Sequence, residues 1–253
     1  MSLVEMVAAA GNVVIFTGAG LSTESGIPDY RSPGGLWTRM KPILFDDFVK
    51  LEDARKETWR RRFEGDDVLT TAKPNAGHYA IAALVASGTA KSVITQNVDN
   101  LHQKSGVPIE QVVELHGNAT FAKCLDCGVR VELDTIRSQY RQMGTAAPCE
   151  ACNGLIKPAT ISFGQAMPEL AMHEARKATL ACDLFIAIGS SLTVYPAAGF
   201  PIMAQRNGAQ LAILNRERTE LDGYADLVIN DEIGRSLGAL IRELGLSGLA
   251  TRH

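Results

Sequence analysis

Short apolar runs alternate with longer amphipathic stretches along most of this chain. Runs that are often β-branched and end at a polar residue or a glycine are typical of buried strands. Five runs fit this description: Val13–Phe16, Ser92–Thr95, Leu184–Ile188, Leu211–Leu214 and Leu227–Ile229. The stretches that repeat apolar residues at helical spacing are Ala76–Ala86, Pro168–Leu180, Pro196–Gln205 and Gly234–Leu244. Because strands alternate with helices, the pattern predicts an α/β fold whose parallel sheet is covered on both faces.

Two segments interrupt this alternation. Residues 36–73 are rich in charged and aromatic side chains, and we interpret them as a small helical insert. Residues 118–157 contain four of the five cysteines and short β-like pieces such as Val129–Leu133. We therefore expect a larger sheet domain built from residues 1–35, 74–117 and 158–253. The smaller domain should consist of the helical insert 36–73 and the cysteine-rich module 118–157.

The cysteines form two pairs at metal-binding spacing. Cys124 and Cys127 make one C-x-x-C pair, Cys149 and Cys152 make the other, and residues 128–148 separate them. Four thiolates fill the tetrahedral coordination sphere of Zn²⁺ and leave no position for a water molecule. We therefore predict one structural zinc ion per chain, held in a zinc ribbon. Cys182 stands alone beside a predicted strand, and we expect it to be buried packing.

A zinc ribbon also suggests an alternative, a non-catalytic module that binds nucleic acid or protein. The chain has 25 basic and 28 acidic residues and a net charge of -3, whereas nucleic-acid-binding proteins usually carry a basic excess. No apolar run approaches the roughly 18 residues of a membrane span, and the N-terminus lacks the basic lead of a secretory signal. Because paired thiols favour a reducing compartment, we expect a cytoplasmic protein without a direct nucleic-acid partner or a membrane.

The first predicted strand is followed by a glycine-rich loop, Thr17-Gly-Ala-Gly-Leu-Ser-Thr-Glu-Ser-Gly-Ile-Pro-Asp-Tyr-Arg-Ser32. A loop of this kind between a strand and a helix can present backbone N–H groups to a phosphate. The third glycine of a dehydrogenase fingerprint would fall at Thr23, so this is not the ordinary motif. The loop ends with an acid, an aromatic ring and a guanidinium side by side, and the guanidinium can clamp a phosphate or carboxylate. The alternative for the whole stretch is a purely structural turn.

Three further motifs accompany this loop: Thr-Gln-Asn-Val-Asp-Asn-Leu-His at residues 95–102, Glu-Leu-His-Gly at 114–117 and Gly-Ser-Ser-Leu-Thr-Val-Tyr-Pro at 189–196. With the loop Gly18–Arg31 and the cysteine pairs, they resemble the sirtuin family in the same order, from about Asn12 to Leu240. The resemblance implies a Rossmann-like large domain, a small zinc domain, and NAD and an acyl-lysine in the cleft between them. It predicts an NAD-dependent protein-lysine deacylase that transfers the acyl group to ADP-ribose and releases nicotinamide. Protein mono-ADP-ribosyl transfer shares the first step and is the alternative.

The resemblance assigns the catalytic roles. His116 matches the histidine that activates a ribose hydroxyl, and an imidazole is suited to this because it titrates near neutral pH. Gln96, Asn97 and Asp99 match the residues that line the nicotinamide pocket and contact the ribose. His102 belongs to the same motif, but we expect it to hold its loop.

The resemblance also implies two binding sets. The residues that match cofactor contacts are Gly18, Ala19, Ser22, Asp29, Tyr30, Arg31, Gln96, Asn97, Asp99, Gly189, Ser190, Ser191, Asn215, Arg216, Glu217 and Ile233. The residues that match a groove in which a peptide adds as a strand are Phe163, Gly164, Leu192, Val194 and Tyr195. We expect the partner to be an acyl-lysine protein or peptide and the chain to be a monomer.

The acyl group is less defined by the sequence. Family members that remove acidic acyl groups use a Tyr-x-x-Arg pair in the helical insert. Here Arg62 stands at roughly the place of the arginine, and Trp59 replaces the tyrosine. The alternatives are that the arginines form a solvated basic helix face and that Trp59 packs with Phe63 at helical spacing.

Overall fold

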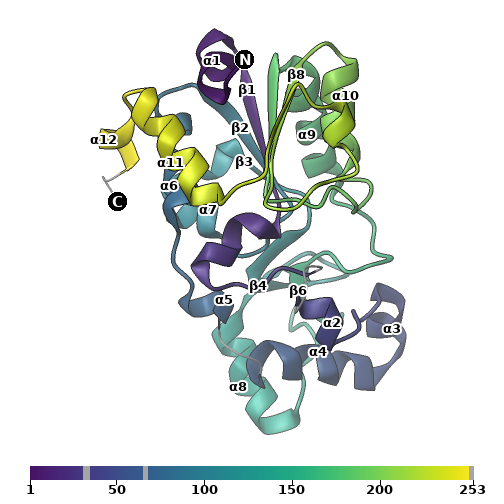
Figure 1. Ribbon diagram of the computed structural model, residues 1–253. Helices are drawn as coiled ribbons and strands as arrows, with labels where there is room; N and C mark the ends of the chain where they lie inside the picture. Colours follow the sequence, from purple (N-terminus) through teal and green to yellow (C-terminus); the bar gives the residue numbers. More distant parts are fainter. Residues whose placement is uncertain (31–34, 65–67, 251–253) are drawn as a thin grey trace.

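The computed structural model describes residues 1–30, 35–64 and 68–250. Within them, six strands form one parallel sheet in the order β3-β2-β1-β7-β8-β9 (Figure 1). Their bounds are β1 Val13–Thr17, β2 Ala90–Thr95, β3 Val112–Glu114, β7 Leu184–Ile188, β8 Gln210–Leu214 and β9 Leu227–Ile229. The predicted parallel sheet is confirmed. The edge strand β3 was not expected, because it has only two apolar residues before the charged Glu114.

Helices cover both faces of this sheet, as predicted. One layer contains α1 Leu3–Ala9, α6 Ala76–Ala86, α11 Ile233–Glu243 and α12 Ser247–Ala250. The other layer contains α9 Glu169–Ala181 and α10 Gly199–Arg206. Side chains alternate along the central strand: Val13 and Ile15 pack under the first layer, whereas Val14 and Phe16 pack under the second. Such alternation into two cores explains why β1 is apolar at four successive positions.

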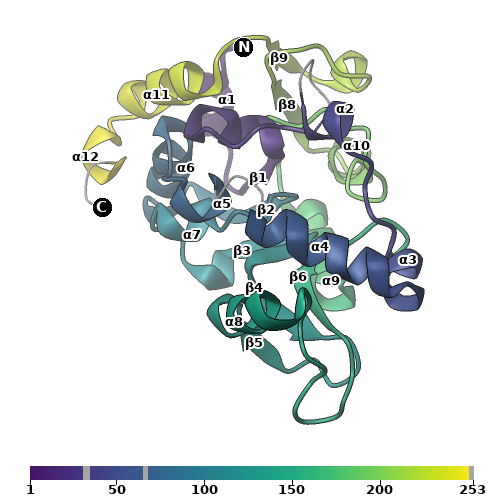
Figure 2. The ribbon, with the colours of Figure 1, turned by 90° about the horizontal axis from the view of Figure 1, so that it is seen from below.

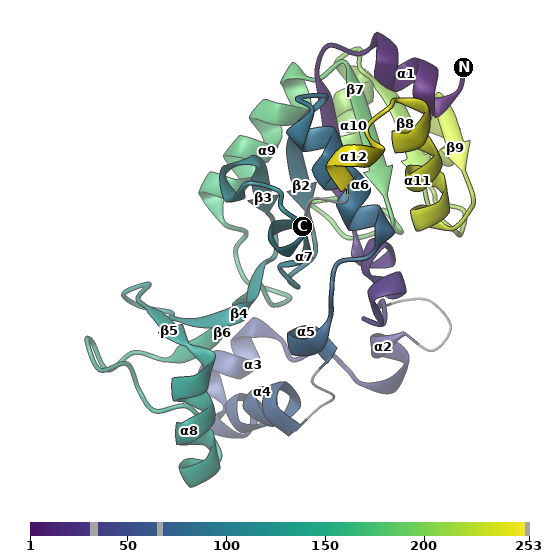
Figure 3. The ribbon, with the colours of Figure 1, turned by 90° about the vertical axis from the view of Figure 1, so that its left-hand side faces the viewer.

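A smaller part of the molecule lies beyond the carboxyl ends of the large sheet (Figure 3). In the described residues its antiparallel sheet has the order β5-β4-β6. Its strands are β4 Gly117–Cys124, β5 Arg130–Glu132 and β6 Ile156–Thr160. The helices of this part are α2 Leu36–Arg39, α3 Phe45–Lys50, α4 Glu52–Glu64, α5 Val68–Thr71 and α8 Leu133–Met143. Figure 2, which is seen from below, shows α4 and α8 next to β4. The remaining short helices are η1 Ala19–Ser25, α7 Leu101–Lys104, η2 Ile109–Gln111 and η3 Asp222–Tyr224.

The helical insert is confirmed, but α8 is a correction to the sequence analysis. We expected only β-like pieces between the cysteine pairs, and the chain becomes helical at Leu133. Leu133, Ile136 and Tyr140 recur at helical spacing and pack in one cluster with Trp59. This amphipathic stripe was present in the sequence and was overlooked.

The division of the chain into domains stays a prediction. β4 begins at Gly117 and β6 ends at Thr160, so the smaller sheet reaches into segments that we assigned to the larger domain. Among the helices that the structure describes, none is long and apolar enough to cross a membrane.

Candidate active site

A cleft of about 620 Å³ opens where the carboxyl ends of the parallel strands face the smaller sheet and α4. Ligands of open α/β sheets bind at this edge. The cleft brings together most of the residues that the sequence analysis selected. They are Gly18, Ala19, Asp29, Tyr30, Gln96, Asn97, His116, Phe163, Gly164, Gly189, Ser190, Ser191, Val194, Tyr195, Asn215, Arg216, Glu217 and Ile233. Ser22, Asp99 and Leu192 lie behind the cleft wall instead, with 1, 5 and 2% of their surface exposed.

The glycine-rich loop after β1 packs tightly against the turn after β7. The N–H of Gly18 donates to the carbonyl of Ile188 (3.0 Å), and the N–H of Gly20 donates to that of Gly189 (2.8 Å). A Cβ atom on Gly18 would lie 2.7 Å from the Gly189 oxygen, a separation that side chains do not tolerate. Glycine is therefore required here for the close approach of two loops. These two amides are engaged within the protein, and phosphate binding by the loop stays a prediction.

His116 stands in the cleft wall between β3 and β4. Its Nδ1 lies 3.1 Å from the carbonyl oxygen of Gln96. Because a carbonyl only accepts, Nδ1 carries the proton and Nε2 keeps its lone pair. Burial lowers the pKa of His116, while the bond to Gln96 acts in the opposite direction. The neutral imidazole with a free Nε2 is the form that a general base requires.

A buried network supports Asn97 beside the glycine-rich loop. The Nδ2 of Asn97 donates to the Gly18 carbonyl (3.1 Å) and to Oγ of Ser22 (3.2 Å). Ser22 in turn donates to Oδ2 of Asp99 (2.7 Å), whose Oδ1 accepts the N–H of Leu101 (2.9 Å). Burial raises the pKa of Asp99, and these hydrogen bonds oppose the rise. Ser22 and Asp99 are thus placed to hold Asn97.

Gln96 links the loops that follow three neighbouring strands. Its N–H donates to the Thr17 carbonyl at the end of β1 (2.9 Å), and its Nε2 donates to Oγ of Ser190 after β7 (2.8 Å). The same Oγ accepts the N–H of Leu192 (3.3 Å). Leu192 has a φ of 56° and is buried. It therefore supports the turn after β7 from inside the protein and does not face the cleft.

The predicted adenosine site lies at the far end of the cleft. The Nδ2 of Asn215 donates to the Glu217 carbonyl (2.7 Å), which closes a turn after β8. Arg216 is exposed and lies 3.9 Å from Glu232. Ile233 begins α11 and is 5% exposed. The site therefore presents an exposed cation and an apolar side chain.

Aromatic rings connect the loop before residue 31 with the predicted peptide groove. The ring centroids of Tyr30 and Trp37 are 5.1 Å apart, and those of Trp37 and Phe163 are 5.2 Å apart. The N–H of Trp37 also donates to the Tyr30 carbonyl (3.1 Å). Sequence reasoning missed Trp37, although a tryptophan shortly after the predicted cofactor contacts Asp29, Tyr30 and Arg31 was a usable signal. Arg31, which we assigned to the cofactor, lies outside the described residues.

Helix α4 forms the wall of the cleft next to the predicted acyl site. Trp59 is fully buried and stacks on Phe63 with centroids 5.6 Å apart, so its predicted packing role is confirmed. Arg61 and Arg62 line the cleft, so these two do not belong to a purely solvated face. Arg62 donates to the Ala119 carbonyl (3.2 Å).

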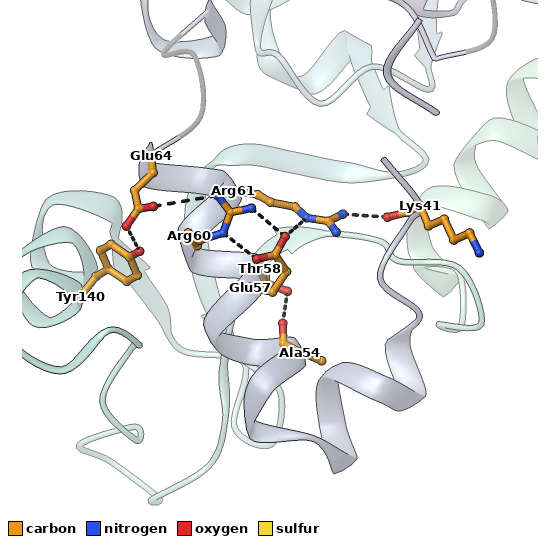
Figure 4. A network of polar contacts seen from close by, with 8 residues as sticks. All are labelled: Lys41, Ala54, Glu57, Thr58, Arg60, Arg61, Glu64 and Tyr140. Atoms are coloured by element: carbon orange, nitrogen blue, oxygen red, sulfur yellow. Dashed lines mark hydrogen bonds and ion pairs between the residues drawn. The ribbon is translucent and has the colours of Figure 1, made fainter. Parts of the chain in front are cut away.

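The cations of α4 are largely engaged by neighbours. Glu57 accepts hydrogen bonds from Arg60 (2.6 Å) and Arg61 (2.7 Å), and Arg61 also donates to the Lys41 carbonyl (2.7 Å; Figure 4).

The buried Lys157 also lines the cleft, and sequence reasoning missed it. Its Nζ donates to the Thr160 carbonyl (2.6 Å), and burial lowers its pKa to about 8.

The paired cysteines converge in the smaller part of the molecule. All four Sγ atoms lie within 4.8 Å of one another. Two of the separations are 3.4 Å, between Cys124 and Cys152, and 3.7 Å, between Cys127 and Cys149. A tetrahedron with Zn–S bonds of about 2.3 Å has edges of about 3.8 Å, so the cluster fits one zinc ion. Cys182 lies apart from them, buried against α9 as expected.

Comparisons with known proteins agree with this arrangement. The model of the Sir2 family matches residues 18–196. An NAD-dependent protein deacetylase of Rhodopseudomonas palustris is 55% identical over 237 residues, 94% of each chain. NAD-dependent protein deacetylase 1 of Bradyrhizobium diazoefficiens is also 55% identical, over 94% of this chain and 93% of its own.

Solved structures give the same result. One described as Sir2 with a p53 peptide and NAD⁺ has a TM-score of 0.88 and 34% identity, covering 98% of this chain and 100% of that chain. Another, a Sir2 protein bound to a propionylated peptide, has a TM-score of 0.85 and 34% identity over 96% and 97% of the two chains. The chain belongs to the Sir2, or sirtuin, family.

Proposed function

We propose that this protein is an NAD-dependent protein-lysine deacylase that transfers the acyl group to ADP-ribose with release of nicotinamide. The observation that carries the proposal is the state of His116. It is a neutral imidazole in the wall of a large cleft, with Nδ1 fixed by the Gln96 carbonyl. A binding module has no need of such a fixed base. The relatives named as NAD-dependent protein deacetylases support the same reaction.

The cleft residues divide the work between the two substrates. When bound, NAD supplies an electrophilic C1′ carbon on its nicotinamide ribose. Asn97 and Gln96, held by Ser22 and Ser190, border the place where that ribose is expected. Nε2 of His116 can accept a hydroxyl proton there, because its other nitrogen is already committed.

An acyl-lysine peptide is the second substrate. Phe163 and Tyr195 lie on the two predicted walls of the groove, with 41 and 70% of their surface exposed. Exposed side chains on both sides of a cleft suit a peptide that lies extended between them. We further propose that the protein acts as a cytoplasmic monomer without a nucleic-acid partner. The four thiol ligands are consistent with the reducing compartment that this location provides.

The test is a panel of acetyl-, propionyl-, succinyl- and long-acyl-lysine peptides incubated with NAD. We expect peptide-dependent release of nicotinamide together with an acyl-ADP-ribose product. His116→Ala should abolish turnover without unfolding the protein. His173→Ala, which alters an exposed histidine on α9, is the matched control and should retain full turnover.

Two outcomes would contradict the proposal. No nicotinamide release with any peptide would refute the deacylase activity. If labelled NAD instead places its label on a protein and not on free acyl-ADP-ribose, mono-ADP-ribosyl transfer is the main activity.

A further inference from the structure

A chain of buried polar groups runs beneath the cleft at the ends of β1 and β2. The neighbouring residues Thr17 and Thr95 end these strands in register. The hydroxyl of Thr17 donates to Oγ1 of Thr95 (2.8 Å), and that oxygen also accepts the backbone N–H of Asn97 (3.0 Å). On the other side, Nε2 of His102 lies 2.9 Å from Oγ1 of Thr17. The imidazole of His102 is therefore connected, through the hydroxyls of Thr17 and Thr95, to the backbone N–H of Asn97.

The direction of this chain follows from its protons. The single proton of Thr17 is used toward Thr95, so Oγ1 of Thr17 can only accept from His102. His102 must then carry its proton on Nε2 and leave Nδ1 bare. His102 is 1% exposed, and burial lowers its pKa to about 4, which keeps the ring neutral at physiological pH.

A second buried histidine, His78, packs against the ring of His102 without a hydrogen bond to it. Nδ1 of His78 accepts the backbone N–H of Asn75 (3.3 Å), so its proton sits on Nε2. The centroids of the rings of His78 and His102 are 5.3 Å apart. Among the described residues, Nε2 of His78 and Nδ1 of His102 have no hydrogen-bond partner. They are a donor and an acceptor on adjacent rings. Burial, with a smaller effect of His102, lowers the pKa of His78 to about 2.

We propose that His102 is a positioning residue for Asn97, with its tautomer fixed by the hydrogen bond that its Nε2 donates to Thr17. This inference rests on the proposed function, in which Asn97 borders the nicotinamide ribose. Each hydrogen bond in this chain has a fixed donor and a fixed acceptor. The chain therefore holds the backbone N–H of Asn97 in one position. The side chain of Asn97 then meets Gly18 and Ser22 in the geometry described above.

The first experiment compares His102→Gln with His102→Met. The two side chains have the same length, but only glutamine retains an N–H that can donate to Thr17. We expect His102→Met to lower kcat about tenfold, the effect of one lost hydrogen bond, with KM for the acyl-peptide unchanged. His102→Gln should retain most of kcat at a similar Tm. Equal kcat in two folded variants would overturn the proposal.

The second experiment breaks the chain elsewhere. Thr17→Val removes the hydroxyl but keeps the shape of the side chain, whereas Thr17→Ser keeps the hydroxyl. We expect Thr17→Val to lower kcat by about the same factor as His102→Met, and Thr17→Ser to retain most of kcat. In the double variant the two losses should not add, because both interrupt one chain. Additive losses would show that the two residues act independently and would refute the chain. If His102→Met does not fold, the threonine pair decides alone.

The third experiment does not depend on turnover. Nitrogen NMR of the wild-type protein with ¹⁵N-labelled histidine should show both buried rings neutral at pH 7 and protonated on Nε2. A proton on Nδ1 of His102 would overturn the proposal. If the wild type has no activity with any acyl-peptide but shows these tautomers, the proposed function fails and the chain stands.

Discussion

Gly189 offers a direct test of the contact between the loops after β1 and β7. Its φ is 62°, and a Cβ atom built on it would lie 2.3 Å from the backbone nitrogen of Leu21. An alanine in the left-handed region costs about 1–2 kcal/mol. Forcing the neighbouring loop away costs about 1–3 kcal/mol more. Gly189→Ala should therefore lower the free energy of unfolding by about 2–5 kcal/mol.

Two other glycines separate these contributions. Gly26 has a φ of 84° with no atom within 4 Å of its Cβ position, so Gly26→Ala should cost only the backbone strain of about 1–2 kcal/mol. Gly199 begins α10 in open space. Gly199→Ala should be neutral or stabilising by up to about 1 kcal/mol, because alanine favours the helix.

Urea denaturation of the three variants measures their free energies of unfolding. The rise in Tm on adding NAD shows whether the cleft still binds NAD. Only Gly189→Ala should lose most of the NAD-induced rise, since Gly189 lines the cleft. If Gly189→Ala and Gly26→Ala are destabilised equally, the contact between the loops contributes nothing and the reasoning is wrong.

Two further predictions concern the metal cluster and the base. Cys152→Ser removes one of four thiolates, so zinc should fall well below one ion per chain and turnover should fall at least tenfold, by metal analysis and the peptide assay. Cys182 lies outside the cluster, so Cys182→Ser should keep the zinc content and the turnover of the wild type. A zinc-free protein with normal turnover would contradict the structural role of the metal. For His116, burial lowers the pKa. Because the base must be neutral, kcat/KM should be flat near pH 7 and fall on acidification, with an apparent pKa below the ordinary value of about 6.5. An acidic limb centred above that value would exclude His116 as the group that titrates.

The parallel sheet and the zinc cluster were predictable because each has a local signature. The strands Leu184–Ile188, which is buried, and Leu227–Ile229, which is half-buried, have the bounds that their apolar residues indicate. The cysteine spacing alone defined a closed tetrahedral site. β3 and α8 were missed for different reasons. β3 has only two apolar residues before the charged Glu114, and α8 lies in the segment between the cysteine pairs, where we expected β-like pieces.

The candidate site was only partly predictable. Motifs indicate which residues belong together, but not which of them face the cleft. Ser22 and Asp99 are in the motifs and are buried behind Asn97. Lys157 and Trp37 face the cleft, and neither was selected. Both depend on how the smaller sheet and the helical insert meet the larger one, which is a tertiary property that local spacing does not encode.

The strand pair β4–β6 connects the cysteine cluster to the position of His116. Cys124 pairs with Ile156 at the end that holds the cysteines, whereas Gly117 pairs with Thr160 at the other end. The N–H of Ile161 donates to the carbonyl of His116 just beyond. Bringing Gly117 and Thr160 together in a free chain carries the loop-closure entropy of the whole segment between them. A zinc ion bound to the cysteines would hold the two strands together at one end, which lowers the entropic cost of pairing them at the other. The zinc site therefore favours the strand pairing that ends beside His116.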